Sequence, residues 1–194
     1  MPLFSFLLFV IISSFTPGPN NIMAMTFANK HGLKETFKFC LGVSFGFFVI
    51  TLLCSIFNII LTSALPLIET PLTLFGVAYM FYLAFKILTS HGNAKENADK
   101  DQNLFFIGIL LQFINPKGIL FGLTVVATFI IPYYNSYSSY LLFSLFLGIV
   151  GLMSTFSWSL FGAMFQKFLL QYRKQFNVAM AVLLVCSAIS ILVQ

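Results

Sequence analysis

The stretch that decides the fold is residues 104–131, LFFIGILLQFINPKGILFGLTVVATFII, an apolar run with the polar group Gln112-Phe113-Ile114-Asn115-Pro116-Lys117-Gly118 near its middle. A membrane-spanning helix needs about 20 mostly apolar residues, so this run is long enough to cross a bilayer. Pro116 lacks a backbone donor and cannot continue a regular helix. The sequence therefore predicts a spanning helix that is broken in its interior, with a lysine at the break.

The first apolar run, residues 3–28, carries a second break of the same kind, Ser13-Ser14-Phe15-Thr16-Pro17-Gly18-Pro19-Asn20-Asn21. Each break follows the start of its run by about the same number of residues, so at about 1.5 Å per residue both lie roughly 20 Å deep, near the bilayer midplane. Two structural proline kinks are one explanation, because such kinks are frequent in membrane helices. Polar side chains and freed backbone groups at that depth favour a wet cavity instead.

The composition indicates an all-α integral membrane protein. Hydrophobic residues make up 59% of the 194 residues and charged residues only 8%, and the mean hydropathy is +0.98. A water-soluble domain would carry about three times that density of charge. Six apolar stretches are long enough to span a bilayer within one transmembrane domain, residues 1–194: 3–28, 39–62, 71–89, 104–131, 139–164 and 176–194.

Basic residues mark one side of the membrane. The connectors after the first, third and fifth spans, together with the end of the third span, hold nine of the ten Lys and Arg residues, and Lys117 is the tenth. By the positive-inside rule these connectors are cytoplasmic, so both termini are expected outside. Because the charge is dispersed, the net charge of +5 does not indicate a nucleic-acid partner.

A polar linker, residues 90–103 (SHGNAKENADKDQN), divides the chain into two parts with three predicted spans each, about 1–89 and about 104–194. With an odd number of spans in each part, the second must enter the membrane in the opposite sense to the first. We therefore expect two inverted three-helix repeats with broken first and fourth helices, an arrangement that is common in secondary transporters.

Acidic residues, histidines and cysteines are placed so that they argue against a metal centre, a cofactor or a catalytic site. The acidic residues and histidines lie in or beside connectors: Glu35, Glu69, Glu96, Asp99, Asp101, His31 and His91. The cysteines lie in apolar runs, where a free cysteine behaves as a small hydrophobe: Cys40, Cys54 and Cys186. No carboxylate or histidine relay is therefore expected within the spans.

The two breaks are expected to bind an anion. A broken helix exposes the N-terminal amides of its second half, which carry a partial positive charge. Asn115 is expected to cap the second half-helix with Pro116 as its first residue, and Thr16 with Pro17 offers the same pair in the first span. Lys117 adds a full charge, which at the bilayer centre costs about 2.5–3.5 kcal/mol on insertion scales. A substrate carboxylate fits these donors.

The predicted substrate-binding residues are those of the two breaks: Thr16, Pro17, Gly18, Pro19, Asn20, Asn21, Gln112, Asn115, Pro116 and Lys117.

Three motifs carry a family resemblance: Thr16-Pro17-Gly18-Pro19-Asn20-Asn21, Gly76-Val77-Ala78-Tyr79 through Tyr82-Leu83-Ala84-Phe85-Lys86, and Gln112-Phe113-Ile114-Asn115-Pro116-Lys117. Over its whole length the chain resembles the lysine exporter (LysE/RhtB) family of bacterial amino-acid exporters. Within that family, the paired Asn20-Asn21, the turn after the first span and the tail Gln166 to Gln175 are most similar to the cysteine and O-acetylserine exporters.

The resemblance implies proton-gradient-driven efflux of small neutral amino acids across a bacterial cytoplasmic membrane, and it leaves room for a homo-oligomer. The motif in the third span adds Tyr79 and Lys86 as further candidates, although Lys86 can equally snorkel to the interface. Many members of the family have Asp where this chain has Asn20. That departure bears on how a proton would be coupled and on how the substrate ammonium group would be held.

Three other classes of function compete with export. An intramembrane enzyme would need a nucleophile at depth, and no spanning His, Asp or Glu is available to activate the serines. A structural or regulatory subunit would not require polar breaks at equivalent positions in both parts. A channel for small solutes would use the same wet cavity, and only saturable, gradient-dependent flux separates a carrier from a pore.

Overall fold

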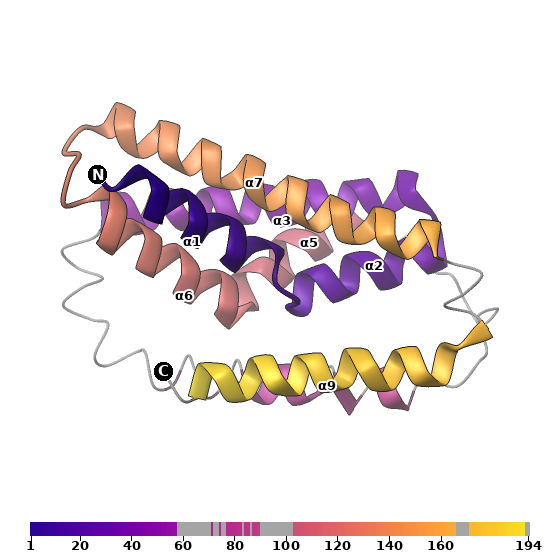
Figure 1. The fold of residues 1–194 in the computed structure, drawn as a ribbon. Helices are drawn as coiled ribbons and strands as arrows, with labels where there is room; N and C mark the ends of the chain where they lie inside the picture. The colour runs from indigo at the N-terminus through magenta and orange to yellow at the C-terminus, as the bar shows by residue number, and fades with distance from the viewer. Residues whose placement is uncertain are drawn as a thin grey trace.

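The computed structural model describes residues 1–57, 71, 74, 77–82, 84, 85, 87–89, 103–165 and 171–192, and every regular element among them is a helix. Figure 1 shows the helices lying roughly side by side. Their bounds are α1 Leu3–Phe15, α2 Pro19–His31, α3 Leu33–Ile56, α5 Leu104–Ile114, α6 Pro116–Val125, the π-helix η1 Val126–Ile130, α7 Tyr137–Met164 and α9 Arg173–Leu192. The predicted all-α class is confirmed.

Two of the helices that the structure describes are long and apolar enough to cross a membrane alone. They are α3, with 24 residues and a mean hydropathy of 2.3, and α7, with 28 residues and a mean hydropathy of 1.8. Two bent combinations of helices reach that length only together. Helices α1 and α2 are bent by 48° at their break, and α5 is bent by 65° relative to α6 and η1. The described residues thus hold up to four candidate spans, and the interruption is confirmed at both predicted places.

Other parts of the six-span prediction are less fully covered by the structure. Within the third predicted span, the described residues between 71 and 88 are helical. Most of the linker 90–103, Lys86 and the connector after the second span lie outside the described residues.

The second and sixth predicted spans are helical, but their helices begin earlier than hydropathy suggests. Helix α3 begins at Leu33 rather than 39, and α9 begins at Arg173 rather than 176. A helix continues through polar residues as long as its backbone remains hydrogen-bonded, so its end need not coincide with the end of the apolar run. Gly32 connects α2 to α3 with a φ of 79°, a positive value that glycine adopts without steric cost.

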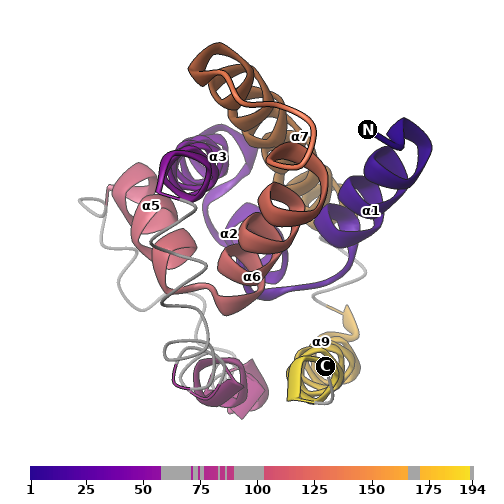
Figure 2. The same cartoon turned by 90° about the vertical axis from the view of Figure 1, so that its left-hand side faces the viewer.

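Helix α3 is the centre of the bundle and contacts α2, α5, α6 and α7. In the view of Figure 2 it lies between α5 and α7. Its contact with α5 is backbone on backbone, because a Cβ on Gly42 would collide with the carbonyl group of Phe105 and one on Gly108 with that of Phe39. Small residues allow this close approach between membrane helices. The α3–α5 contact therefore holds the helix that leads to the second break against α3.

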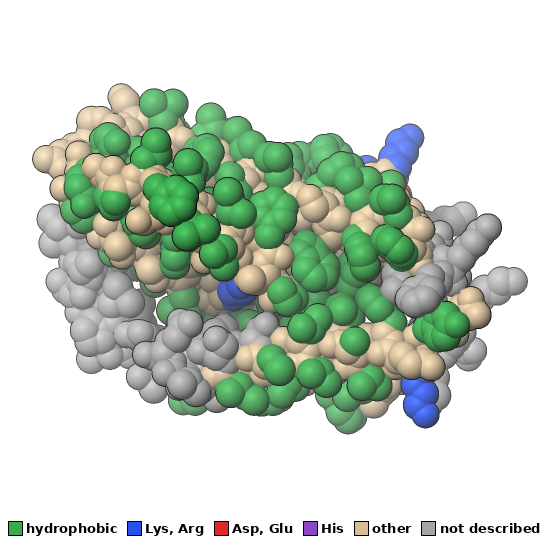
Figure 3. All heavy atoms as spheres, in the orientation of Figure 1, with side chains coloured by type: hydrophobic (Ala, Val, Ile, Leu, Met, Phe, Trp, Pro, Cys, Tyr) green, Lys and Arg blue, Asp and Glu red, His purple; other side chains and the backbone are tan. Residues whose placement is uncertain are grey.

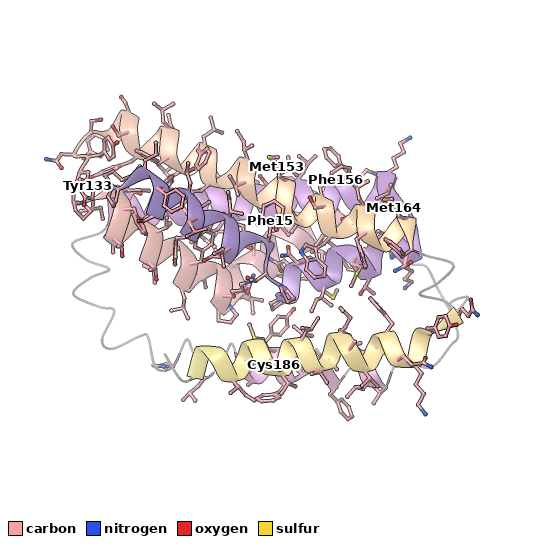
Figure 4. All side chains as sticks on the ribbon, viewed as in Figure 1. Phe15, Tyr133, Met153, Phe156, Met164 and Cys186 are labelled. Carbon is pink, nitrogen blue, oxygen red and sulfur yellow. The ribbon has the colours of Figure 1, made fainter. Side chains whose placement is uncertain are left out.

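Helix α9 packs beside the helical residues between 71 and 88. Asn177 Nδ2 donates to the carbonyl oxygen of Ile87 at 2.9 Å. Met180 and Leu184 of α9 join Ala84 in one apolar cluster, which also includes Ile22 and Met25 of α2. Cys186 lies on α9 and is exposed (Figure 4).

The outer surface is apolar, as expected for a protein that faces lipid. Large hydrophobic side chains are strongly exposed, including Phe4 at 80%, Phe106 at 64% and Leu142 at 66%. Figure 3 shows hydrophobic side chains over much of the visible face, whereas the basic side chains in view lie at one end, apart from one near the middle. This distribution agrees with a molecule whose long axis crosses the membrane.

Candidate functional site

The first break runs from Thr16 to Gly18. Thr16 is the C-cap of α1, with extended backbone angles of φ −63° and ψ 147°, and Gly18 is the N-cap of α2, with Pro19 as its first residue. The expectation that Thr16 and Pro17 form the capping pair is wrong. Each proline disfavours helical angles at the residue before it, so both Thr16 and Gly18 are extended and the helix resumes only at the second proline.

Side chains from three other helices satisfy the carbonyl groups at the end of α1. Phe15, labelled in Figure 4, is the last residue of that helix. From α2, Asn21 Nδ2 donates to Ser14 O at 2.9 Å and to Thr16 O at 3.1 Å. From α7, Ser154 Oγ donates to Ser14 O at 2.6 Å and Trp158 Nε1 donates to Phe15 O at 3.2 Å. From α6, Lys117 Nζ donates to Thr16 O at 2.9 Å. Helices α2, α6 and α7 thus hold the first break in place.

The second break is shorter. Helix α5 ends at Ile114, Asn115 is the N-cap of α6, and Pro116 is the first residue of α6, as predicted. The side chain of Asn115 makes no capping hydrogen bond. Only 6% of the residue is exposed, yet its Oδ1 atom has no hydrogen-bond partner among the described residues.

Lys117 joins the two breaks. Its Nζ atom donates to Thr16 Oγ1 at 2.7 Å and to Thr16 O at 2.9 Å, with a longer contact to Pro17 O at 3.4 Å. A Cβ on Gly18 would lie 2.9 Å from Lys117 Cδ, so a residue without a side chain leaves room for the lysine. The ammonium group rests at the negative end of the α1 dipole. Among the described residues no carboxylate pairs with it, the one ion pair there being Lys38 with Glu35.

A second contact between the breaks involves two buried amides. Asn20 Nδ2 donates to Gln112 Oε1 at 2.5 Å, and these residues are 5% and 3% exposed. The two residues are far apart in sequence, because Asn20 lies in the first turn of α2 and Gln112 in the last turn of α5. Their contact brings the polar residues of the two breaks together.

A partly open cavity lies at this meeting point and comprises about 450 Å³ of empty space, open solvent included. Six of the predicted residues line it: Gly18, Asn20, Asn21, Gln112, Asn115 and Lys117. Thr16, Pro17, Pro19 and Pro116 shape the breaks but are not among its lining residues. Tyr79 packs in the apolar cluster of α2 and α9 instead, and Lys86 lies outside the described residues.

Sequence reasoning missed several lining residues. They are Ser13 and Ser14 of α1, Val43 and Phe47 of α3, Gly118 and Phe121 of α6, and Gly151, Ser154 and Thr155 of α7. Ser13, Ser14 and Gly118 sit within the quoted breaks and could have been included on that ground. The residues of α3 and α7 lie on unbroken apolar helices, so no local signal distinguishes them from ordinary packing residues.

The lining of the cavity provides groups that suit a small polar molecule. It offers amides, hydroxyl groups and one ammonium group, and no Asp, Glu or His lines it among the described residues. Two helix N-termini, those of α2 and α6, open at the breaks, and backbone N–H groups in a first helical turn have no partner within the helix. Such ends favour an anionic group.

The sequence profile described as LysE type translocator matches residues 11–194. The chain belongs to the LysE-type translocator family. The resemblance inferred from the motifs is thereby confirmed, and the protein is a transporter rather than an enzyme. Comparison with solved structures gave no significant match.

Curated relatives match nearly the whole chain. The cysteine/O-acetylserine efflux protein of Salmonella choleraesuis (strain SC-B67) is 37% identical over 191 residues, which cover 98% of this chain and 97% of that protein. The protein of the same description from Salmonella typhi is 36% identical over 191 residues. The one from Escherichia coli O6:H1 is 35% identical over 188 residues, covering 96% of this chain and 95% of the relative.

Proposed function

We propose that this chain exports small neutral amino acids such as cysteine or O-acetylserine across the bacterial cytoplasmic membrane. The observation that carries the proposal is the cavity between the two breaks, which is lined by Lys117, by polar uncharged side chains and by the apolar Val43, Phe47 and Phe121. The relatives described as cysteine/O-acetylserine efflux proteins support this substrate class.

In this proposal the substrate carboxylate binds at the N-termini of α2 and α6 beside Lys117. The backbone amides of Asn20, Lys117 and Gly118 lie in the first helical turns, where no intrahelical acceptor is available. The Lys117 ammonium has two short hydrogen bonds and a third contact at 3.4 Å, which is weak. A carboxylate can replace that weak contact and neutralise a charge that no described acid compensates.

The same charge disfavours basic amino acids. A cationic side chain would have to enter a cavity that already holds Lys117, and no described carboxylate is present there to compensate it. Like charges in a poorly solvated site repel each other strongly. A zwitterion with a neutral side chain brings no such penalty.

The mode of transport forms the second part of the proposal. The two parts of the chain, about 1–89 and 104–194, act as inverted repeats that expose the cavity alternately to each side of the membrane, with both termini outside. The bent pairs α1–α2 and α5–α6 support this scheme because each breaks just before a proline that begins its second half-helix. The proton gradient is proposed as the driving force on the strength of the family resemblance.

The test is to overexpress the chain in a bacterium and to identify the amino acids in the medium by mass spectrometry. Cysteine, O-acetylserine or a similar small neutral amino acid should accumulate, and the cells should tolerate an excess of it. Cells with an empty vector are the control. Release of lysine or arginine alone would contradict the proposed substrate class, and flux that neither saturates nor depends on a gradient would indicate a channel.

A further inference from the structure

Three side-chain oxygens around the cavity are buried and accept no hydrogen bond from the residues that the structure describes. They are Ser14 Oγ, Asn20 Oδ1 and Asn115 Oδ1, and all three residues line the cavity. Asn20 and Asn115 are more than nine-tenths buried. Buried polar atoms nearly always have a partner, because an unpaired one costs folding free energy. Three unpaired acceptors around one cavity indicate that a hydrogen-bond donor binds there.

The orientation of these atoms indicates what kind of donor it is. Asn20 uses its Nδ2 atom to donate to Gln112 Oε1, so its unpaired Oδ1 atom is an acceptor on the other side of the amide. An ammonium group has three N–H donors and no acceptor, and the two amide oxygens and the Ser14 hydroxyl oxygen can each accept from it. Helices α1 and α5 end at the breaks, so the negative ends of their dipoles also lie there.

We propose that Ser14, Asn20 and Asn115 form the subsite that binds the α-ammonium group of the substrate, while Lys117 and the half-helix N-termini bind its carboxylate. The inference rests on the proposed function and extends it by assigning the two charged ends of a zwitterion to different groups of atoms in the cavity. It also explains how a cavity without a described acid holds a cationic group: neutral oxygens and helix ends supply the negative potential. Selection for an α-amino group then depends on these three side chains.

Three probes separate the two subsites in competition assays on the purified full chain in proteoliposomes. Cysteine carries both charged groups, cysteamine lacks the carboxylate, and 3-mercaptopropionate lacks the ammonium group. The variants are Ser14→Ala and Asn115→Leu. Because the Asn115 side chain makes no capping bond, its replacement should leave the start of α6 intact. Asn115→Asp keeps an acceptor oxygen and serves as the conservative variant.

Ser144→Ala is the matched control. Ser144 Oγ on α7 is likewise buried without a partner among the described residues, and Ser144 does not line the cavity. Loss of an unpaired hydroxyl group as such is therefore tested separately from loss of a subsite acceptor.

Ser14→Ala and Asn115→Leu should each weaken binding of cysteine and cysteamine about 10-fold or more, because hydrogen bonds to a charged group are lost. Binding of 3-mercaptopropionate should not change. Asn115→Asp should retain cysteamine binding, and Ser144→Ala should behave like the wild type. If the variants weaken binding of all three probes equally, or of none of them, the subsite assignment is wrong. The proposed function is not contradicted by that result, because the wild-type chain still transports cysteine. A wild-type chain that does not transport cysteine would contradict the proposed function as well.

Discussion

Replacing Lys117 with alanine should raise the KM for a small neutral amino acid strongly while the protein still reaches the membrane. The change removes the ammonium group that is proposed to meet the substrate carboxylate. A hydrogen bond to a charged group contributes about 1.5–3 kcal/mol. That range corresponds to a rise in KM of about 10- to 150-fold, if KM follows the binding free energy.

The structure also predicts that folding changes less than transport. Thr16 O, which accepts from Lys117 at 2.9 Å, also accepts from Asn21 Nδ2 at 3.1 Å and so keeps a partner in the variant. Removing a buried cation that no described acid compensates also removes its desolvation cost. The contact between the two breaks is retained through Asn20 and Gln112.

Lys117→Arg should restore transport only in part. The lysine side chain runs close against Gly18, where even a Cβ would lie 2.9 Å from its Cδ atom. A planar guanidinium group is larger than an ammonium group and spreads its charge over several donors, so it cannot take the same position.

The assay is uptake of radiolabelled cysteine into proteoliposomes at several substrate concentrations, with protein amounts matched by immunoblot. Lys174→Ala, which removes an exposed basic side chain on α9, is the control. A wild-type KM for Lys117→Ala would refute the assignment of the carboxylate to this lysine.

Three further predictions concern topology, packing and driving force. A reporter fused after Gly92 should lie in the cytoplasm, and a cysteine placed at the exposed Asn135 should react with an impermeant reagent from outside. The opposite labelling would overturn the orientation. Gly108→Val should destabilise the protein by about 1–3 kcal/mol in thermal unfolding, because it forces α3 and α5 apart. The control Gly122→Ala, whose Cβ would meet its nearest atoms at 3.4 Å, should be tolerated. A protonophore should abolish net export, and export that continues at the full rate would exclude proton coupling.

Much of the fold follows from the sequence because lipid imposes strong local constraints. Each span must be apolar and about 20 residues long, so α3 and α7 are visible directly in the hydropathy. Prolines cannot continue a helix, so the breaks before α2 and α6 are visible as well. Asn115 and Pro116 were assigned correctly because they form an N-cap and first-turn pair with no competitor nearby.

The first break shows where the capping prediction failed and why. Pro17 and Pro19 both satisfy the preference for proline at the first helical position, but Pro19 also disfavours helical angles at Gly18, so the helix begins only at Pro19. Thr16 O and Thr16 Oγ1 instead accept hydrogen bonds from Lys117. This contact joins residues on separate helices, so the local sequence did not reveal it.

By itself, the sequence determined that this chain is a helical membrane protein with two polar breaks, because hydropathy and proline chemistry act within one helix. Only the tertiary structure decided that the breaks meet, that α3 and α7 complete the cavity, and that Lys117 reaches the end of α1. These features depend on how helices far apart in sequence pack together. The close α3–α5 approach at Gly42 and Gly108 is one such contact, and no periodicity within a single helix encodes its partner.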